Sequence, residues 1–417
     1  MTKTATDVIA GIDTHADTHH VGLITSYGKH LGDREFLAVG SGYRDIAKYI
    51  TSHGPVAAVG IEGTGSYGAE LSRVLTTEGF QIREVNRPNR AHRRLHGKSD
   101  PIDAYQAAEA VLAERGTSVP KSRDGYVEAL RVLRTARTSA LKARTAVLAQ
   151  ISGTLTSAPE PIRAKYRGQT SEARVKVMAA SRPAAEDPAD PAAATAITLK
   201  RMGLRHRYLS EEIAEVDAEI EAIVATHAPH LLEVNGIRAV VASQLLVTVG
   251  DNPERLDSEA AFAALTGTAP VPASSGKITR HRLSRGGDRA ANSAVHRIVL
   301  VRMSKDQRTR DYVARRTAEG KDKLEIMRCL KRYVSREIYR TPRTRTVRTK
   351  NSSKPGRTTA AAQWTSEAES DSHHHGTDDV SNGVHRPRSR LNLRNKPIQT
   401  RLLLHPHSVL PTTPERR

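Results

Sequence analysis

The stretch Val8–Thr25, VIAGIDTHADTHHVGLIT, contains two apolar runs separated by a short polar turn. The first run, residues 8–15, is typical of a buried strand that ends in polar residues, and the second, residues 19–25, is typical of its hairpin partner. The chain is therefore expected to open with a β-hairpin whose first strand has an acidic residue, Asp13, at its end.

The N-terminal part continues as an alternation of strands and helices. REFLAV, residues 34–39, predicts a third strand, and residues 41–54 predict a helix that is capped by Ser41 or Gly42 and ends at Gly54. A fourth strand, a second helix and a fifth strand are expected at residues 56–63, 66–79 and 81–86. A three-strand meander followed by alternating helices and parallel strands is the order of a ribonuclease-H-like α/β domain.

The middle of the chain has the pattern of two long helices. Apolar residues recur at helical spacing from Asp124 to about Gln150, and again from about Ala196 to Thr226. The Pro- and Ala-rich residues 181–194 form the expected linker or hairpin tip. Two helices that return on each other predict an antiparallel coiled-coil arm, which could grip nucleic acid, form a dimer or act only as a solvated spacer.

A third region after Pro229 is expected to be mainly helical. Asn235 and Gly236 lie between two apolar helical stretches, as in a helix-hairpin-helix element whose backbone N–H groups contact a phosphate, although a glycine turn between helices is common. Exposed serines, a basic patch with a Gly-Gly turn and another helix follow. From about Thr341 the chain is rich in Arg, Ser, Thr and Pro without periodicity, which predicts disorder.

The composition indicates the class of partner. A formal charge of +20 and a pI near 10.2 favour a polyanion, most often nucleic acid, with an anionic membrane as the competitor. The sequence has neither a long apolar run nor a signal peptide, so a cytoplasmic location is expected. The single cysteine, Cys329, excludes an intramolecular disulfide and a thiolate metal cluster. With 4% aromatic residues, a stacking single-strand binder is disfavoured.

Two aspartates stand near the start of a further predicted helix. Pro101 suits the first turn of a helix, so Asp100 is the expected N-cap, and Asp103 would share its helical face. Acidic residues at a helix start are common without any chemistry. Taken alone, capping therefore explains this pair.

A metal site explains these two acids together with two others. Asp13 ends the first strand and Glu62 ends the fourth, and these strands are neighbours in a ribonuclease-H-like sheet. Four converging carboxylates repel one another by several kcal/mol unless cations neutralise them. Hard divalent ions prefer carboxylate oxygens, so the sequence predicts Mg²⁺ bound by Asp13, Glu62, Asp100 and Asp103.

Several blocks of the chain resemble the DEDD-type insertion-sequence transposases, the family named "IS one-ten", from roughly Val8 to Arg340. These blocks are GIDTHADTHHVGL, GIEGTGSYGAEL, NRPNRAHRRLHGKSDPIDAYQAAEA, VNGIRAVVASQLL and SSGKITRHRLSRGGDRAANSAVHRIVLVRM. The resemblance implies a RuvC-like domain that carries the DEDD carboxylates and a transposase domain that carries a nucleophilic serine. It further implies a recombinase that excises and inserts its own element, guided by a structured bridge RNA.

The resemblance also assigns roles to individual residues. It places Asp13, Glu62, Asp100 and Asp103 on the metal-binding quartet and Ser275 on the nucleophile, with Ser274 as the close alternative. A serine hydroxyl needs a base or a metal for activation, and its phosphate target needs cations nearby. The expected nucleic-acid contacts are Asn235, Gly236, Lys277, Arg280, Arg282 and Arg285.

The expected organisation has four parts. They are a RuvC-like domain at residues 1–120, a helical arm at 121–228, a transposase domain at 229–340 and a disordered basic tail at 341–417. This tail departs from the family pattern and has the composition of a read-through or a shifted frame. The expected partners are DNA, a guide RNA and further copies of the chain, and a bacterial, nucleoid-associated location follows.

Two other functions account for the same sequence. In a Holliday-junction-type nuclease the carboxylates would activate water, and Ser275 would be a bystander. In a non-catalytic nucleic-acid-binding protein the acids would only cap helices, and the arm would be the binding element. A covalent protein–DNA adduct separates the transposase from both.

Overall fold

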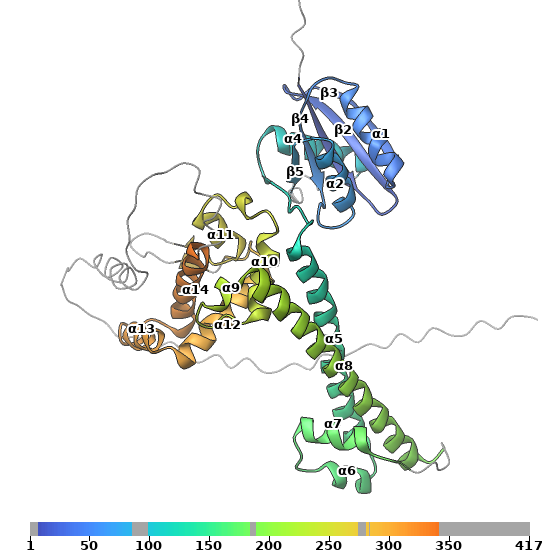
Figure 1. Ribbon diagram of the computed structural model, residues 1–417, viewed down its shortest axis with the longest axis vertical. Coiled ribbons are helices and arrows are strands. Elements are labelled where there is room, and N and C mark those ends of the chain that lie inside the picture. The colour runs from blue at the N-terminus through green and yellow to red at the C-terminus, as the bar shows by residue number, and fades with distance from the viewer. Residues whose placement is uncertain (1–6, 86–98, 184–188, 274–280, 283, 342–417) are drawn as a thin grey trace, which may run out of the picture. The chain divides into compact units, whose positions relative to one another are not determined.

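The computed structural model describes residues 7–85, 99–183, 189–273, 281–282 and 284–341 (Figure 1). Its N-terminal part is a six-stranded mixed sheet with the order β3-β2-β1-β4-β5-β6. β1 runs antiparallel to β2 and parallel to β4, so the expected pairing of the first and fourth strands is confirmed. The strands are β1 (Val8–Thr14), β2 (Thr18–Thr25), β3 (His30–Leu37), β4 (Val56–Glu62), β5 (Ile82–Val85) and β6 (Thr117–Ser118).

Helices cover both faces of this sheet, and the alternation of β1 assigns its residues to one face or the other. Ile12 packs in a core with Ile46 of α1 (Gly40–Thr51) and Leu71 of α2 (Ala69–Thr77). Ile9 packs in a second core with Ala108 of α4 (Asp100–Leu112). Odd-numbered residues of β1 therefore face α4, and this alternation places the Asp13 side chain on the same side. The arrangement is that of a ribonuclease-H-like α/β domain.

The approach of α4 to the sheet depends on a glycine. A Cβ atom at Gly11 would lie 2.1 Å from the Ala104 carbonyl oxygen, which is far inside van der Waals contact. Only glycine lets the helix backbone lie directly on β1. This close packing brings the first turn of α4 next to the end of β1.

Several predicted element boundaries are wrong, most clearly those of β3 and α1. β3 begins at His30 rather than at residue 34, because its pairing with β2 continues back toward the turn. α1 begins at Gly40 with Val39 in the N-cap position, and it ends at Thr51. Ser41 and Gly42 are therefore inside its first turn and do not cap it.

The predicted capping role of Asp100 is also wrong. Ser99 occupies the N-cap position of α4, without a side-chain capping hydrogen bond, and Asp100 is the first helical residue. The Asp103 N–H donates to the Ser99 carbonyl oxygen over 3.0 Å, so the backbone itself closes the first turn. The carboxylate of Asp100 is thus available for another contact, which is described below.

Two long helices follow the sheet and lie side by side, with the chain running out along one and back along the other (Figure 1). They are α5 (Tyr126–Ser157) and α8 (Pro191–His227). The Arg137 guanidinium pairs with the Asp217 carboxylate between them. The expected linker at residues 181–194 is partly wrong, because α8 begins within it at Pro191, and residues 184–188 are outside the described residues. Two short helices that were not predicted, α6 (Glu160–Tyr166) and α7 (Ser171–Ala180), precede it.

The C-terminal part is mainly helical, as expected, with one small two-stranded sheet. Its elements are α9 (Pro229–Leu232), α10 (Ala239–Val249), the 3₁₀ turn η1 (Pro253–Arg255), α11 (Glu259–Leu265), β7 (Val271–Pro272), β8 (His281–Arg282), α12 (Arg289–Lys305), α13 (Gln307–Ala318) and α14 (Lys323–Arg340). The expected disordered tail, from residue 342 onward, lies outside the described residues. Among the helices that the structure describes, none has the length and apolar character that crossing a bilayer requires.

Candidate active site

The site begins where β1 and β4 end beside each other. The parallel register pairs Ile12 with Ile61, so Asp13 and Glu62 follow at adjacent strand ends. The Thr14 hydroxyl donates to the Glu62 carbonyl oxygen over 2.7 Å and ties the two ends together. Asp13 is buried, with 7% of its surface exposed, whereas Glu62 is half-buried.

A histidine joins this strand end to α4. The His15 Nε2 atom lies 3.1 Å from Asp13 Oδ2 and 3.3 Å from Asp100 Oδ1. These three residues each offer one ligand atom, and the three atoms lie within 4.8 Å of one another. His15 is a candidate site residue that sequence reasoning missed. Its signal was its position two residues after Asp13, just past the end of a buried strand.

Asp103 is the most deeply buried acid of the site. It is 1% exposed on α4, one turn after Asp100, and its charge acts on Asp13. Burial raises the pKa of Asp13, and repulsion by Asp103 and Asp100 adds to this rise, while the nearby His15 opposes it. The ionised form of Asp13 is thus disfavoured in the protein alone, and a cation at this point would relieve the penalty.

The four predicted carboxylates therefore differ in how closely the structure brings them together. Asp13 and Asp100 both contact His15, and Asp103 lies close enough to raise the pKa of Asp13. Glu62 stands at the neighbouring strand end, and neither Glu62 nor Asp103 belongs to the described set of ligand atoms within 4.8 Å. Carboxylate oxygens with one imidazole nitrogen are a donor set that suits a divalent cation.

The predicted nucleophile falls between the strands of the small C-terminal sheet. β7 and β8 are antiparallel, with Val271 opposite Arg282 and Pro272 opposite His281. Arg282 and Arg285 are exposed. Four predicted site residues lie outside the described residues, namely Ser274, Ser275, Lys277 and Arg280.

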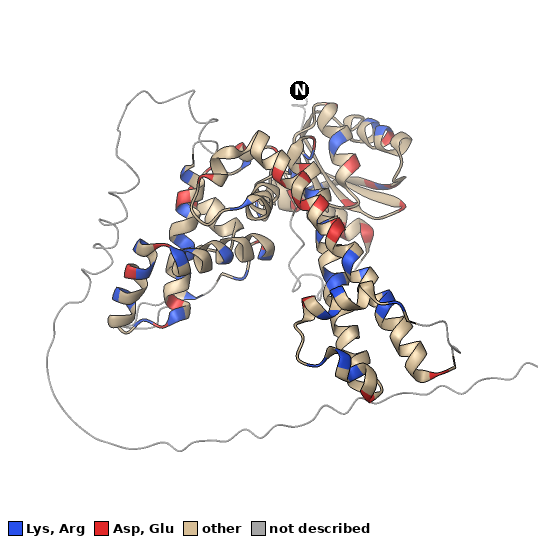
Figure 2. Ribbon diagram, turned by 60° about the horizontal axis from the view of Figure 1, so that its bottom comes forward, with Lys and Arg blue, Asp and Glu red and all other residues tan. Residues whose placement is uncertain are grey.

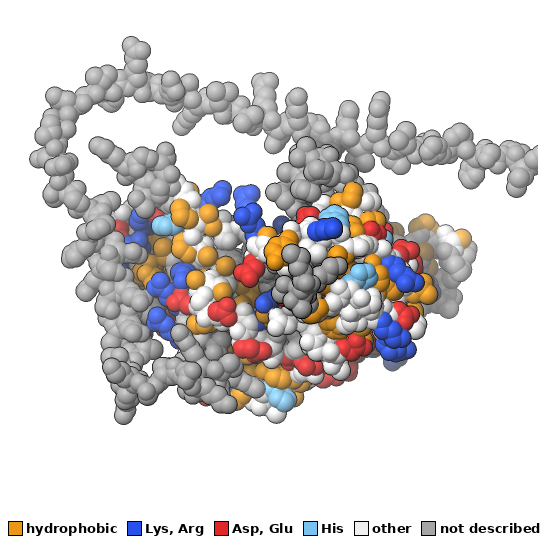
Figure 3. Space-filling model, turned by 90° about the horizontal axis from the view of Figure 1, so that it is seen from above, with side chains coloured by type: hydrophobic (Ala, Val, Ile, Leu, Met, Phe, Trp, Pro, Cys, Tyr) orange, Lys and Arg blue, Asp and Glu red, His pale blue; other side chains and the backbone are white. Residues whose placement is uncertain are grey.

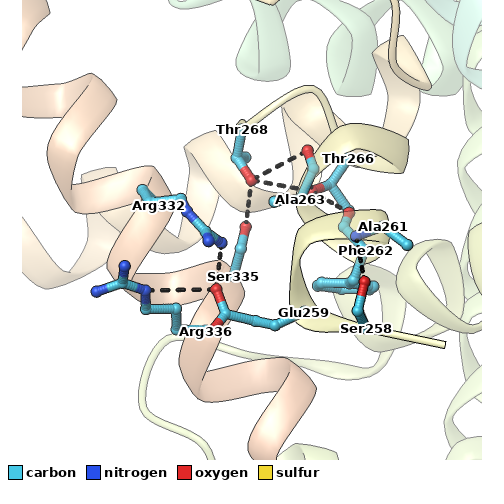
Figure 4. Close-up of polar contacts among 10 residues, drawn as sticks. All are labelled: Ser258, Glu259, Ala261, Phe262, Ala263, Thr266, Thr268, Arg332, Ser335 and Arg336. Carbon is cyan, nitrogen blue, oxygen red and sulfur yellow. Dashed lines mark hydrogen bonds and ion pairs between the residues drawn. The ribbon is translucent and has the colours of Figure 1, made fainter. Parts of the chain in front are cut away.

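Buried and half-buried polar contacts hold α11 and the chain just before β7 on α14 (Figure 4). The Thr268 hydroxyl donates to the Ser335 hydroxyl of α14 over 2.9 Å, and Ser335 has no exposed surface. Glu259 of α11 pairs with the guanidinium groups of Arg332 and Arg336 on α14. Hydrogen bonds and ion pairs between α11, α14 and the chain before β7 favour one arrangement of these segments.

The chain after β8 is attached to the same place. A Cβ atom at Gly287 would lie 2.3 Å from the Gly267 nitrogen, so the two glycines pack directly against each other. The Asn292 amide of α12 donates to the carbonyl oxygens of Thr266 and Gly267 over 3.0 and 2.9 Å. Both flanks of the segment that carries the predicted nucleophile are thus fixed on the helical core.

The glycine turn between α9 and α10 is packed onto α12. Gly236 has a φ of 84°, which favours glycine, and the Arg302 guanidinium donates to the Asn235 carbonyl oxygen over 2.8 Å. The Asn235 amide donates to Asp306 over 3.3 Å. The predicted phosphate contact of Asn235 and Gly236 stays a prediction.

Basic side chains are spread over several elements rather than confined to the predicted site. Lys and Arg residues recur along α12, α13 and α14, as the blue segments of the ribbon show (Figure 2). On the face shown in Figure 3, acidic, basic and apolar side chains of the described residues are interspersed. In addition to the β7–β8 segment, the basic helices of the C-terminal part therefore offer a second surface that could bind a polyanion.

Comparisons with known proteins agree with this division. A family model described as a transposase of the DEDD IS110 type matches residues 10–159, and one described as "Transposase IS116/IS110/IS902 family" matches residues 228–314. The chain is 28% identical over 171 residues to the "Insertion element IS900 uncharacterized 42 kDa protein" of Mycobacterium paratuberculosis. That match spans 40% of this chain and 42% of the relative, about two fifths of each.

Proposed function

Because the chain belongs to the IS110 family of transposases, we propose that it cuts and rejoins DNA through Mg²⁺-assisted attack by Ser275, guided by a structured RNA. The observation that carries the metal-dependent part is the convergence of Asp13, His15 and Asp100. The family model that covers these residues is named for its DEDD acids, and this supports assigning Glu62 and Asp103 to the same site.

In this proposal Asp13, Glu62, Asp100 and Asp103 hold the cation. The raised pKa of Asp13 supports it, because buried like charges need a compensating positive charge. A bound divalent cation supplies positive charge to a phosphate and lowers the pKa of a hydroxyl group beside it. The hydrogen bond from the Thr14 hydroxyl to the Glu62 carbonyl oxygen holds the ends of β1 and β4 in register.

The proposed chemistry is phosphoryl transfer to the serine. The Ser275 hydroxyl loses its proton and its oxygen forms a bond to the scissile phosphorus, while the bond from phosphorus to a deoxyribose oxygen breaks and that oxygen takes up a proton and leaves as a hydroxyl group. The phosphoserine link keeps the phosphodiester free energy, so attack by a second DNA hydroxyl rejoins strands without another energy source. Arg282 is the last residue of β8 and Arg285 follows three residues later. In this proposal both bind phosphate oxygens together with Lys277 and Arg280.

The remaining parts of the chain receive supporting roles in the same proposal. Residues 1–120 form the RuvC-like domain, 121–228 the coiled-coil arm, 229–340 the serine-bearing transposase domain and 341–417 a basic tail. The arm holds copies of the chain together, and the Asn235–Gly236 turn contacts the DNA backbone as in a helix-hairpin-helix. The fixed position of this turn on α12 supports such a role, because a rigid turn presents its backbone at low entropic cost.

Trapping of a covalent intermediate tests this function. The protein is incubated with Mg²⁺, DNA that carries the element ends and RNA transcribed from the flanking noncoding segment, and adducts are resolved under denaturing conditions. We expect an adduct that Ser275→Ala abolishes and Ser274→Ala preserves. Cleavage without an adduct, unaffected by Ser275→Ala, would indicate a nuclease, and binding without cleavage would indicate a non-catalytic protein.

A further inference from the structure

His15 lies at a distance from both carboxylates that suits a shared ion. Its Nε2 atom is 3.1 Å from Asp13 Oδ2 and 3.3 Å from Asp100 Oδ1. Two neighbouring ligand atoms on an octahedral ion with bonds of about 2.1 Å are separated by about 3.0 Å. One ion can therefore contact all three groups with only small shifts of their side chains.

The backbone around His15 is fixed, so this position does not depend on a freely moving loop. The His15 N–H donates to the Thr18 carbonyl oxygen over 3.0 Å and closes the turn between β1 and β2. The His15 side chain is 39% exposed, which leaves it open to an ion that arrives from solvent. Asp13 lies behind it, in the buried end of β1.

We propose that His15 is a ligand of the same cation as Asp13 and Asp100, and that its nitrogen biases the site toward Mn²⁺ relative to Mg²⁺. This inference rests on the proposed metal site. Mg²⁺ strongly favours oxygen ligands, whereas first-row transition ions bind N/O sites with an affinity that rises along the series from Mn²⁺. An imidazole between two carboxylates therefore adds more affinity for Mn²⁺ than for Mg²⁺.

If His15 has a different role, its removal should change the affinity for metal ions in the opposite direction. If His15 only bridges the two carboxylates as a hydrogen-bond donor, it competes with any cation for the same oxygens. Its removal would then leave the affinity for both ions unchanged or raise it. The direction of the change in affinity thus separates a ligand from a bridge.

Mn²⁺ binding to the full chain, followed by electron paramagnetic resonance, tests the proposal, with Mg²⁺ measured by displacement of Mn²⁺. We expect His15→Gln to weaken Mn²⁺ binding by about 10-fold and Mg²⁺ binding by clearly less. We also expect nitrogen modulation of the Mn²⁺ spin echo in the unaltered protein and its loss in His15→Gln. Equal effects on both ions, tighter binding, or a spin echo without nitrogen modulation would overturn the proposal.

Two further variants make the outcome specific. His53→Gln removes an exposed imidazole two residues after the end of α1, where it contacts the Tyr49 carbonyl oxygen, and should change neither affinity. Asp13→Asn should weaken the binding of both ions. If Asp13→Asn has no effect, the metal site of the proposed function fails, whereas an unchanged Mn²⁺ to Mg²⁺ ratio in His15→Gln overturns only the role of His15.

Discussion

At the scale of single residues, the candidate site forms where β1 ends beside β4 and where a turn residue, His15, lies between the carboxylates of Asp13 and Asp100. Asp13 and Glu62 follow apolar runs, and parallel neighbours bring such ends together, as the pairing of β1 with β4 confirms. His15 lies in a turn, where the sequence carries no periodicity to give its direction. Asp100 was predicted as a cap because Asp is common there, but its carboxylate instead faces His15.

Neutralising Asp13 should separate activity from folding. Burial raises the pKa of Asp13 above 3.8, so the folded protein holds a proton there at pH values where the unfolded chain has lost it. The free energy of unfolding without metal therefore falls as the pH rises from 3.8 through the raised pKa. We expect Asp13→Asn to lower recombination by about 100-fold or more, with an unchanged or higher melting temperature without metal. The same loss of activity is expected for Glu62→Gln and Asp103→Asn.

Circular dichroism melts at pH 4 and pH 7.5 check this expectation. The control is Asp45→Asn, since Asp45 is an exposed residue of α1 that lies 3.6 Å from the Lys48 ammonium group. That variant should keep full activity. An Asp13→Asn protein that is unfolded at 25 °C, or one that recombines normally, would contradict a metal-binding role for this carboxylate.

His19 should make the N-terminal domain sensitive to acid. It has no exposed surface and stacks on Tyr43 with ring centroids 5.7 Å apart, and burial lowers its pKa from 6.5. The unfolded chain therefore binds a proton before the folded one does, so stability is lost as the pH falls from 6.5 toward the lowered pKa. In denaturant titrations between pH 7.5 and pH 5, His19→Phe should show a smaller loss of stability than the unaltered protein, and an identical slope would refute the prediction.

At the scale of elements, strands and long helices followed from periodicity, whereas their ends and the short elements did not. α5 and α8 were expected from apolar spacing, whereas α7 lies between the two predicted helices and before the predicted linker, where no element was predicted. β6 has two residues, too few for a pattern, and is defined by its pairing with β5. The ends of strands and the short elements depend on pairing with distant parts of the chain, and the local sequence pattern carries no information on that pairing.

The contact between α4 and β1 should tolerate no added side-chain atom at Gly11. A Cβ atom at Gly11 would lie 2.1 Å from the Ala104 carbonyl oxygen, so Gly11→Ala must push α4 and its aspartates away from Asp13. We expect a loss of stability of about 1–3 kcal/mol or more, together with weaker Mn²⁺ binding.

Chemical denaturation and Mn²⁺ titration measure these two effects. Gly153→Ala is the matched control, because a Cβ atom there meets no atom within 4 Å and Ala favours the interior of α5 by up to about 1 kcal/mol. Gly11→Ala behaving like Gly153→Ala would show that α4 does not depend on this contact.

At the scale of the whole molecule, the two halves of the proposed site lie on different parts of the chain. The acids belong to the N-terminal sheet and α4, and Ser275 follows α11, with the helix pair α5 and α8 between them in sequence. α5 has 32 residues, and a rise of 1.5 Å per residue makes it about 48 Å long. A helix of this length can carry the serine to a neighbouring copy, so we predict active sites built from two chains.

Complementation tests the prediction of shared sites. Neither Ser275→Ala nor Asp13→Asn should recombine DNA alone, but mixed assemblies should regain some sites with all the required groups. We expect recombination in the mixture at roughly a quarter of the level of the unaltered protein, if copies mix at random in pairs. Complete inactivity, with exchange of subunits verified by affinity tags, would show that each site is built within one chain.

The central claim is that Ser275 becomes joined to DNA with help from the carboxylates, and peptide mapping of the adduct tests it most directly. The adduct is digested with nuclease and trypsin, and mass spectrometry locates the remaining nucleotide in the peptide that ends at Lys277. We predict a nucleotide on Ser275, absent in Asp13→Asn and when Mg²⁺ is removed. A nucleotide on Ser274 or on another residue, or an adduct that forms equally well in Asp13→Asn, would contradict the account.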